Sequence, residues 1–315
     1  MRALAVLLVV LAAASPPTLI ERSEQTLPLV FNQGIARVDG GWILSGTNSP
    51  LPGTDALERV DDQLHVLAVH PLAIPPDLRL AGYDHVGDID VIGNVIYAPF
   101  EQPNYDLGYQ STGRYDATTL GFIDAVQLPQ HENSFVTVDE TTMTAYSMDH
   151  FDGDTLQRYD VNAGWTPLPP LQLTMVLHST QGADIADGAV WISTSDDHNG
   201  VYRVDLRTGE TVSVGTLGHP GAEGEGIDAT ALPSGALHAL VNDPTNLAVH
   251  LGHYDLTSDQ PVPATTGPPS SLSSSPAALA ATGGRPWLGD TAITLLIVAA
   301  LAMRLAARAS ARRTP

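Results

Sequence analysis

The chain has 315 residues, no cysteine, and 35 acidic against 14 basic residues, which gives a net charge of −21. The lack of cysteine excludes disulfides, thiolate metal sites and cysteine nucleophiles. The acidic excess disfavours nucleic-acid binding and makes cations the expected partners, although acidity also serves simply to keep a surface soluble.

The first 14 residues are predicted to be a secretory signal peptide. One arginine precedes an apolar run, and the small residues Ala12-Ala13-Ala14 suit cleavage after Ala14. An uncleaved anchor is the alternative, but the apolar run is short for a membrane span. Residues 15–25 are then expected to form an N-terminal linker.

Five similar segments fill residues 26–257, which we interpret as one domain. Each joins two short apolar runs by a tight turn. They are QGIARVDGGWILSGTN (33–48), VGDIDVIGNVIYAPFE (86–101), NSFVTVDETTMTAYSMD (133–149), QGADIADGAVWISTSD (181–196) and EGIDATALPSGALHALVN (225–242). A third run follows each pair and a fourth follows most, with a period of about 44 to 53 residues. Five units of four antiparallel strands predict an all-β, five-bladed β-propeller.

The fifth unit has no fourth strand of its own, because a Pro-rich stretch begins after residue 257. The N-terminal segment TLPLVF (26–31) has no strand partner nearby. We therefore expect it to supply the outer strand of the fifth blade and close the ring, which would remove exposed sheet edges.

Residues 258–278 are rich in Pro, Ser and Thr and are expected to form an extended spacer. The pentapeptide LAATG (279–283) follows, and residues 284–315 hold an apolar run and an Arg-rich tail. This order resembles a Gram-positive cell-wall sorting signal, in the LAxTG form common in actinobacteria. The resemblance implies that a sortase cuts between Thr282 and Gly283 and joins Thr282 to the cell envelope.

A plain C-terminal membrane anchor is the alternative reading of this tail. A hydrophobic helix from Trp287 to Ala307 could cross the membrane with its arginines on the cytoplasmic side. Either reading places the propeller outside the cell, at the surface.

The strand starts of the Gln-Gly type and the Tyr-Asp or Val-Asp turns resemble those of the wider propeller superfamily. Within it, the chain is similar to five-bladed glutamine cyclotransferase-like proteins and to lactonase and regucalcin-like propellers. The stretch Phe31-Asn32-Gln33-Gly34 is the local likeness to the cyclotransferases. The resemblance implies the fold, and it carries no catalytic residue over to this chain.

One face of the propeller is predicted to gather polar side chains. The first strand of a blade leaves one end of the axis and the second strand returns to it, so the start of the first and the end of the second share a face. Nine of the ten residues at these positions are polar, which marks this face as the working one: Gln33, Val86, Asn133, Gln181 and Glu225 at the starts, and Asn48, Glu101, Asp149, Asp196 and Asn242 at the ends.

Histidines and further carboxylates lie in or near the connections that enter the first strands, at His85, His131, His178, His219, Asp88 and Glu223. Carboxylate and amide oxygens suit Ca²⁺, and histidine with carboxylate suits Zn²⁺. We therefore predict an axial cation or ligand site. Its candidate residues are His85, Asp88, Glu101, His131, Asn133, Asp149, His178, Gln181, Asp196, Glu225 and Asn242.

The expected function is a surface-anchored binding or scaffold module, a monomer whose partners are a sortase, the cell envelope and an unidentified extracellular ligand. A metal-dependent hydrolase of lactonase or esterase type is the alternative, with His85, His131 or His178 as general base. A glutamine cyclotransferase-like enzyme is the third reading. Fold alone does not choose among them, because propellers host many activities.

Overall fold

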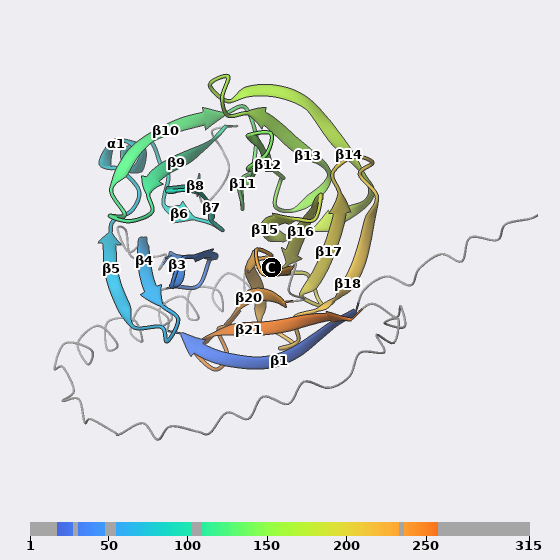
Figure 1. Ribbon diagram of the computed structural model, residues 1–315. Coiled ribbons are helices and arrows are strands. Elements are labelled where there is room, and N and C mark those ends of the chain that lie inside the picture. The colour runs from blue at the N-terminus through green and yellow to red at the C-terminus, as the bar shows by residue number, and fades with distance from the viewer. Residues whose placement is uncertain (1–17, 28–30, 48–54, 103–108, 233–235, 258–315) are drawn as a thin grey trace, which may run out of the picture. The chain divides into compact units, whose positions relative to one another are not determined.

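Five antiparallel sheets surround a common axis in the computed structural model (Figure 1). The structure describes residues 18–27, 31–47, 55–102, 109–232 and 236–257. The five sheets confirm the all-β, five-bladed propeller. The expected signal peptide, spacer, LAATG motif and C-terminal hydrophobic helix lie outside the described residues.

The strands follow one another from the axis to the rim in four of the five blades. The first blade is β2 (Gly34–Val38), β3 (Gly41–Gly46), β4 (Ala56–Asp61) and β5 (Val66–Pro71). The second is β6 (His85–Val86) with β7 (Asp90–Ile92), then β8 (Val95–Glu101), β9 (Gln110–Asp116) and β10 (Phe122–Leu128). The third is β11 (Thr137–Asp139), β12 (Thr144–Ser147), β13 (Asp152–Asp160) and β14 (Thr166–His178). The fourth is β15 (Thr180–Ala186), β16 (Ala189–Thr194), β17 (Gly200–Asp205) and β18 (Thr211–Thr216). The fifth is β19 (Glu223–Asp228), β20 (Ala236–Asp243), β21 (Ala248–Thr257) and β1 (Thr18–Leu27).

Burial follows position in the blade. Every residue of the second strands β3 and β16 is buried, whereas the outer strands β5 and β10 are mostly exposed. Second strands lie between two neighbouring blades, so both of their faces are covered, and their sequences are nearly continuous apolar runs. The large buried aromatic residues recur at equivalent places in these strands: Trp42, Tyr97, Tyr146 and Trp191.

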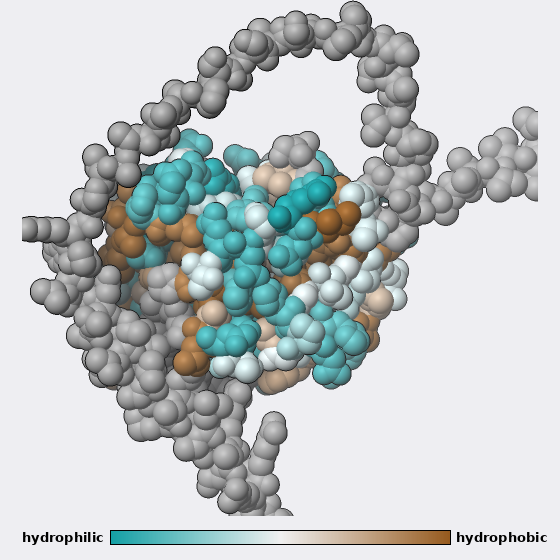
Figure 2. All heavy atoms as spheres, turned by 90° about the horizontal axis from the view of Figure 1, so that it is seen from below, coloured by the Kyte–Doolittle hydropathy of each residue, from teal (hydrophilic) through white to brown (hydrophobic). Residues whose placement is uncertain are grey.

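The N-terminal strand closes the ring, but it is not the segment that the sequence indicated. Strand β1 pairs along its whole length with β21, from Thr18 opposite Thr257 to Leu27 opposite Val249. It therefore begins inside the expected linker and ends where the expected strand of residues 26–31 begins. The reason is its polarity, because an outermost strand has one face in water and needs few apolar residues. Hydrophilic side chains dominate the middle of the face seen in Figure 2, which views the molecule from the side on which β1 lies in Figure 1.

One short helix, α1 (Pro76–Leu80), lies in the connection between the first two blades. It starts after Pro75 with a second proline at its first turn, where a missing N–H costs nothing. Within the described part of the chain, no helix combines the length and apolar character that crossing a membrane requires.

The carboxylate of Asp88 lies at the centre of the ring and joins its blades. The first strand of the second blade is split around it, into β6 and β7. Its two oxygens accept four backbone N–H groups at 2.9–3.2 Å, those of Ile35, Ile89, Ala183 and Ile227.

The backbone N–H of Asp88 completes the connection to the remaining blade. It donates to the carbonyl of Ser134 in the third blade at 3.0 Å, and Asp88 forms a parallel bridge with Phe135. All five blades therefore meet at one aspartate. Burial raises its pKa well above the usual range, against the lowering effect of the four N–H groups.

Glycines at the strand starts make room for this carboxylate. A Cβ at Gly182 would lie 2.6 Å from Oδ2 of Asp88, and one at Gly226 would lie 2.5 Å from Oδ1. Real Cβ atoms do not come so close to an oxygen. The repeated glycine after Gln181 and Glu225 is therefore required by the narrowness of the axis.

Replacing Asp88 by alanine should destabilise the whole ring. The substitution leaves four buried N–H groups without their acceptor, and an unsatisfied buried donor costs about 1–3 kcal/mol. We expect the free energy of unfolding to fall by more than about 3 kcal/mol. Denaturant unfolding measures this, with Asp197→Ala on an exposed loop as the matched control; equal stabilities for the two variants would contradict the role of Asp88.

Candidate functional site

Six polar residues meet where the first strands begin, around the axis. Strand pairing sets His85 opposite Glu101 and Glu223 opposite Asn242. These residues belong to the first, second and fifth blades, and we call them the axial mouth: Gln33, His85, Glu101, Glu223, Glu225 and Asn242. The mouth contains three carboxyl groups, one imidazole and two amides, so it can exchange protons and donate hydrogen bonds.

Glu225 is a buried acid of the axial mouth. It is 2% exposed, and burial raises its pKa well above the usual range. The negative charges of Glu223, Asp88 and Glu101 raise it further, and a hydrogen bond from Asn242 lowers it. A carboxyl group in this setting keeps its proton at a pH where an exposed glutamate is ionised.

The imidazole of His85 comes from the second blade, whereas Glu225 belongs to the fifth. Its Nε2 is 2.7 Å from Oε1 of Gln33, which fixes the orientation of the ring. Glu101, opposite His85 in the sheet, is buried as well. A neutral carboxyl, a second carboxyl and an imidazole in one place are the components of a general acid–base pair.

The third blade contributes a second, smaller group of acids. Burial raises the pKa of Asp149, and its Oδ1 accepts the backbone N–H of Glu132 at 3.3 Å. Glu132 is buried, and its Oε2 accepts the N–H of Phe151 at 2.9 Å. Sequence reasoning missed Glu132, although it stands between the two selected residues His131 and Asn133.

Several predicted site residues are not at the mouth. The side chains of His131 and His178 are 63% and 62% exposed, and Nδ1 of His178 lies 2.5 Å from Oδ1 of Asp152. Neither histidine is placed to act as a base beside Glu225.

The remaining predicted residues make local structural contacts. Asn133 is fully buried and bonds Ser111 and Ser147, and Gln181 donates to Ser195. Asp196 accepts the backbone N–H groups of its own loop, at His198 and Gly200. Asp88 has both oxygens occupied by backbone N–H groups, so its place is in the core rather than in a ligand shell. Asn48 lies outside the described residues.

Three further aspartates lie along the axis beyond Asp88, and each accepts a backbone N–H from the next blade. Asp90 accepts from Val138 at 2.7 Å, Asp184 from Ala229 at 2.6 Å, and Asp228 from Arg37 at 2.7 Å. Burial raises the pKa of Asp90 to about 6 and that of Asp184 well above its usual range. These acids hold neighbouring blades together. Nothing in the sequence distinguishes them from the other aspartates of the repeats.

A group of histidine and carboxylate side chains close enough to share one metal ion lies away from the axial mouth. Among the described residues, three histidine or carboxylate side chains bring their ligand atoms within 4.8 Å of one another at Glu24, His219 and His250. This group lies on the rim of the fifth blade. His219 was noted in the sequence, but Glu24 and His250 gave no signal because ring closure alone brings them together.

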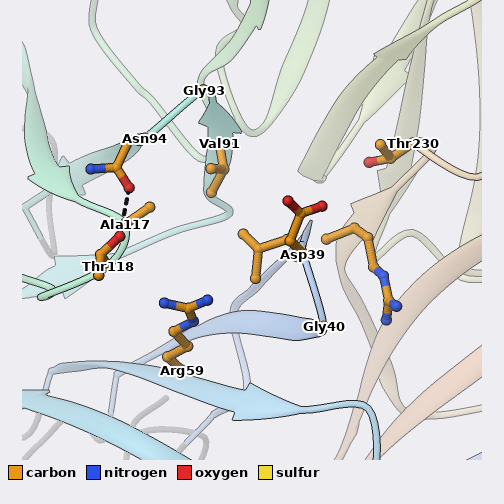
Figure 3. A pocket seen from close by; sticks show the side chains of 11 residues that line it. Asp39, Gly40, Arg59, Val91, Gly93, Asn94, Ala117, Thr118 and Thr230 are labelled. Atoms are coloured by element: carbon orange, nitrogen blue, oxygen red, sulfur yellow. Dashed lines mark hydrogen bonds between the residues drawn. The ribbon is translucent and has the colours of Figure 1, made fainter.

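A polar pocket of about 460 Å³ opens on the opposite face, which carries the turns between first and second strands (Figure 3). Its polar and charged lining residues are Arg37, Asp39, Arg59, Asn94, Thr118 and Thr230. The guanidinium of Arg37 lies 4.6 Å from the ring centroid of Trp42 and bonds Asp62 at 2.5 Å. Two guanidinium groups beside hydroxyl and amide groups suit an anionic ligand.

A glutamine at position 225 should flatten the pH dependence of stability. The folded pKa of Glu225 is raised, so its contribution to stability is complete below the unfolded pKa and is lost as the pH rises through the folded one. Glu225→Gln cannot ionise, and its stability relative to the natural chain should therefore rise with pH, by up to about 1.4 kcal/mol per pH unit. Unfolding free energies between about pH 5 and pH 9 test this; parallel curves would mean that Glu225 is already ionised at the lower pH.

No model of a known protein family matches the sequence, and no curated protein matches it. Solved structures do match. The glutaminyl cyclase of Myxococcus xanthus is similar with a TM-score of 0.57 at 13% identity, over 77% of this chain and 97% of that one. A GH43 glycoside hydrolase, whose engineered active site displays both endo-xylanase and exo-arabinofuranosidase activity, is similar with a TM-score of 0.51 at 13% identity, over 80% of this chain and 59% of that one. At these identities the likeness shows the fold, a five-bladed propeller that enzymes share.

Proposed function

We propose that the chain is an acid–base enzyme whose active site is the axial mouth. The observation that carries this proposal is the buried carboxyl of Glu225, whose pKa burial and the charges of Glu223, Asp88 and Glu101 raise, with His85 opposite Glu101 in the second blade. An isolated buried carboxyl is costly to a fold, and strongly raised pKa values in a cleft are a recognised mark of functional sites.

Cyclisation of an N-terminal glutamine residue is the reaction that this arrangement supports best. The substrate's free amine attacks the carbonyl carbon of its own side-chain amide, the amide C–N bond breaks, and ammonia leaves. Glu225 would donate a proton to the departing nitrogen, and Glu101 or His85 would take the proton that the attacking amine loses. The acidic mouth also attracts a cationic peptide N-terminus.

Two observations support this choice over other acid–base reactions. The fold is similar to that of a glutaminyl cyclase over nearly the full length of that chain. The Phe31-Asn32-Gln33-Gly34 stretch also borders the mouth, where Gln33 orients His85 and its carbonyl accepts the N–H of Gly226 at 2.7 Å.

Loss of the acid should abolish turnover without unfolding the chain. We expect Glu225→Gln to lower kcat/KM on a peptide with N-terminal glutamine by at least about 100-fold, since general acid catalysis contributes that much. Release of ammonia and the mass of the product measure the reaction. The control is Glu58→Gln, which removes another buried glutamate, with a pKa raised to about 7, from the third strand of the first blade. Equal activity of the two variants would remove Glu225 from the mechanism.

A surface-displayed binding module is the second candidate function, and the pocket lined by Arg37 and Arg59 favours it. In that case an anionic ligand would bind in the pocket beside Arg37 and Arg59, and the axial mouth would have no catalytic role. The metal-dependent hydrolase has less support, because two of its three predicted bases, His131 and His178, have mostly exposed side chains, and His85 alone lies at the mouth.

The place of action that we propose is the cell surface. The order of spacer, LAATG, apolar run and Arg tail supports export followed by attachment through Thr282. A sortase and the cell envelope are the partners that this route requires.

Thr282 provides the test of attachment. The natural chain should be released from cells by enzymes that digest the wall, whereas Thr282→Ala should stay in the membrane fraction because a sortase no longer recognises the motif. Fractionation with antibody detection distinguishes the two. If both chains partition into the membrane, the tail is a plain anchor.

A further inference from the structure

Strand β1 is joined to the rest of the propeller by an additional group of side chains at the rim. Glu24 lies on β1 and His250 on β21, the strand that β1 pairs with. His219 lies in the connection between β18 and β19. Pairing of β1 with β21 therefore brings Glu24 to two histidines that come from later segments of the chain.

The two histidines contact different oxygens of the one carboxylate. Nδ1 of His250 lies 2.6 Å from Oε1 of Glu24, and Nε2 of His219 lies 2.6 Å from Oε2. The imidazole rings stack with their centroids 4.6 Å apart at 22°. Both rings therefore present a nitrogen to the same small volume, in which ligand atoms of all three residues lie within 4.8 Å of one another.

The backbone holds His219 in this position. It is a non-glycine residue with φ at +52°, a conformation that L-residues rarely adopt. Its carbonyl accepts the N–H of Ala222 at 3.0 Å and the side-chain amide of Asn199 at 3.4 Å. These contacts hold the backbone of His219 in one conformation and so fix where its imidazole begins.

Two imidazoles and one carboxylate form a donor set that Zn²⁺ prefers. Zinc bonds of about 2.0–2.1 Å place tetrahedral ligand atoms about 3.3 Å apart. The two 2.6 Å contacts of Glu24 must therefore lengthen when the ion enters. The side chain of Glu24 is 28% exposed and has room to move. The net charge of −21 also concentrates cations around the chain.

We propose that Glu24, His219 and His250 bind one Zn²⁺ ion that fastens β1 to the fifth blade, with water in the fourth position. The ion ties the first strand of the chain to the last, so its role is to hold the ring closed. This site is separate from the axial mouth, and the inference does not depend on the reaction proposed there.

Metal content and thermal unfolding of the purified full chain test the site. After chelation and dialysis against Zn²⁺, the natural chain should retain about one zinc per chain. Its melting temperature should rise by about 5 °C, because an ion that binds the folded state alone stabilises it. Hydrogen exchange of the β1 amides, residues 18–27, should slow when the ion is bound.

The variants separate a metal site from a simple His–Glu ion pair. Glu24→Gln keeps the shape of the side chain and one acceptor oxygen but removes the charge and lowers the affinity for metal, so zinc content should fall to the level of the chelated protein. His178→Ala is the matched control, since it removes an exposed histidine that is also paired with a carboxylate, to Asp152. It should retain its zinc.

Three results would overturn the proposal. They are a natural chain that holds no zinc after dialysis, a Glu24→Gln variant that holds as much as the natural chain, and a His178→Ala variant that loses it. Glu24→Gln could melt at a lower temperature without metal simply because it loses an ion pair. Zinc content still separates the two explanations, because a plain ion pair predicts that the natural chain binds no zinc.

Discussion

The acceptance of four backbone N–H groups by Asp88 is the interaction on which the propeller depends. A five-bladed ring leaves a narrow axis, in which first strands from different blades approach one another with unpaired backbone donors. One carboxylate satisfies four of these donors and, through its own N–H, reaches the remaining blade. The glycines at the strand starts and the split of β6 from β7 follow from this meeting point.

The same axis explains why acid–base chemistry is available at one end of it. Asp88, Asp90 and Asp184 are buried acids with raised pKa values, and each is committed to backbone donors. Glu225 stands in the same field of negative charge but has a side-chain amide as its partner instead. Its neutrality follows first from burial, and the negative charge of Asp88 adds to it. A substitution of Asp88 would therefore alter the proton affinity of Glu225 as well as the stability of the ring.

The repeat in the sequence was sufficient to predict the fold, because buried second strands must be apolar and their spacing repeats. The closing strand was misplaced, since an outer strand with one face in water carries no such pattern. Asp88 resembled a metal ligand because a sequence does not reveal whether a carboxylate meets an ion or four amides. His131 and His178 follow the same positional rule as His85, yet they point into solvent. Glu24 and His250, 226 residues apart, become neighbours only through closure.

Strand β1 has a consequence for the order in which the chain acquires its structure. It is made first, while its partner β21 is the last strand of the domain, so it must wait unpaired until all other blades exist. Contacts so distant in sequence form late and slowly. An apolar strand exposed for that interval would be an aggregation hazard. The polar sequence TLIERSEQTL avoids the hazard. The low hydrophobicity of β1 makes the strand hard to predict from the sequence. The same property lets β1 remain soluble until the other blades have formed.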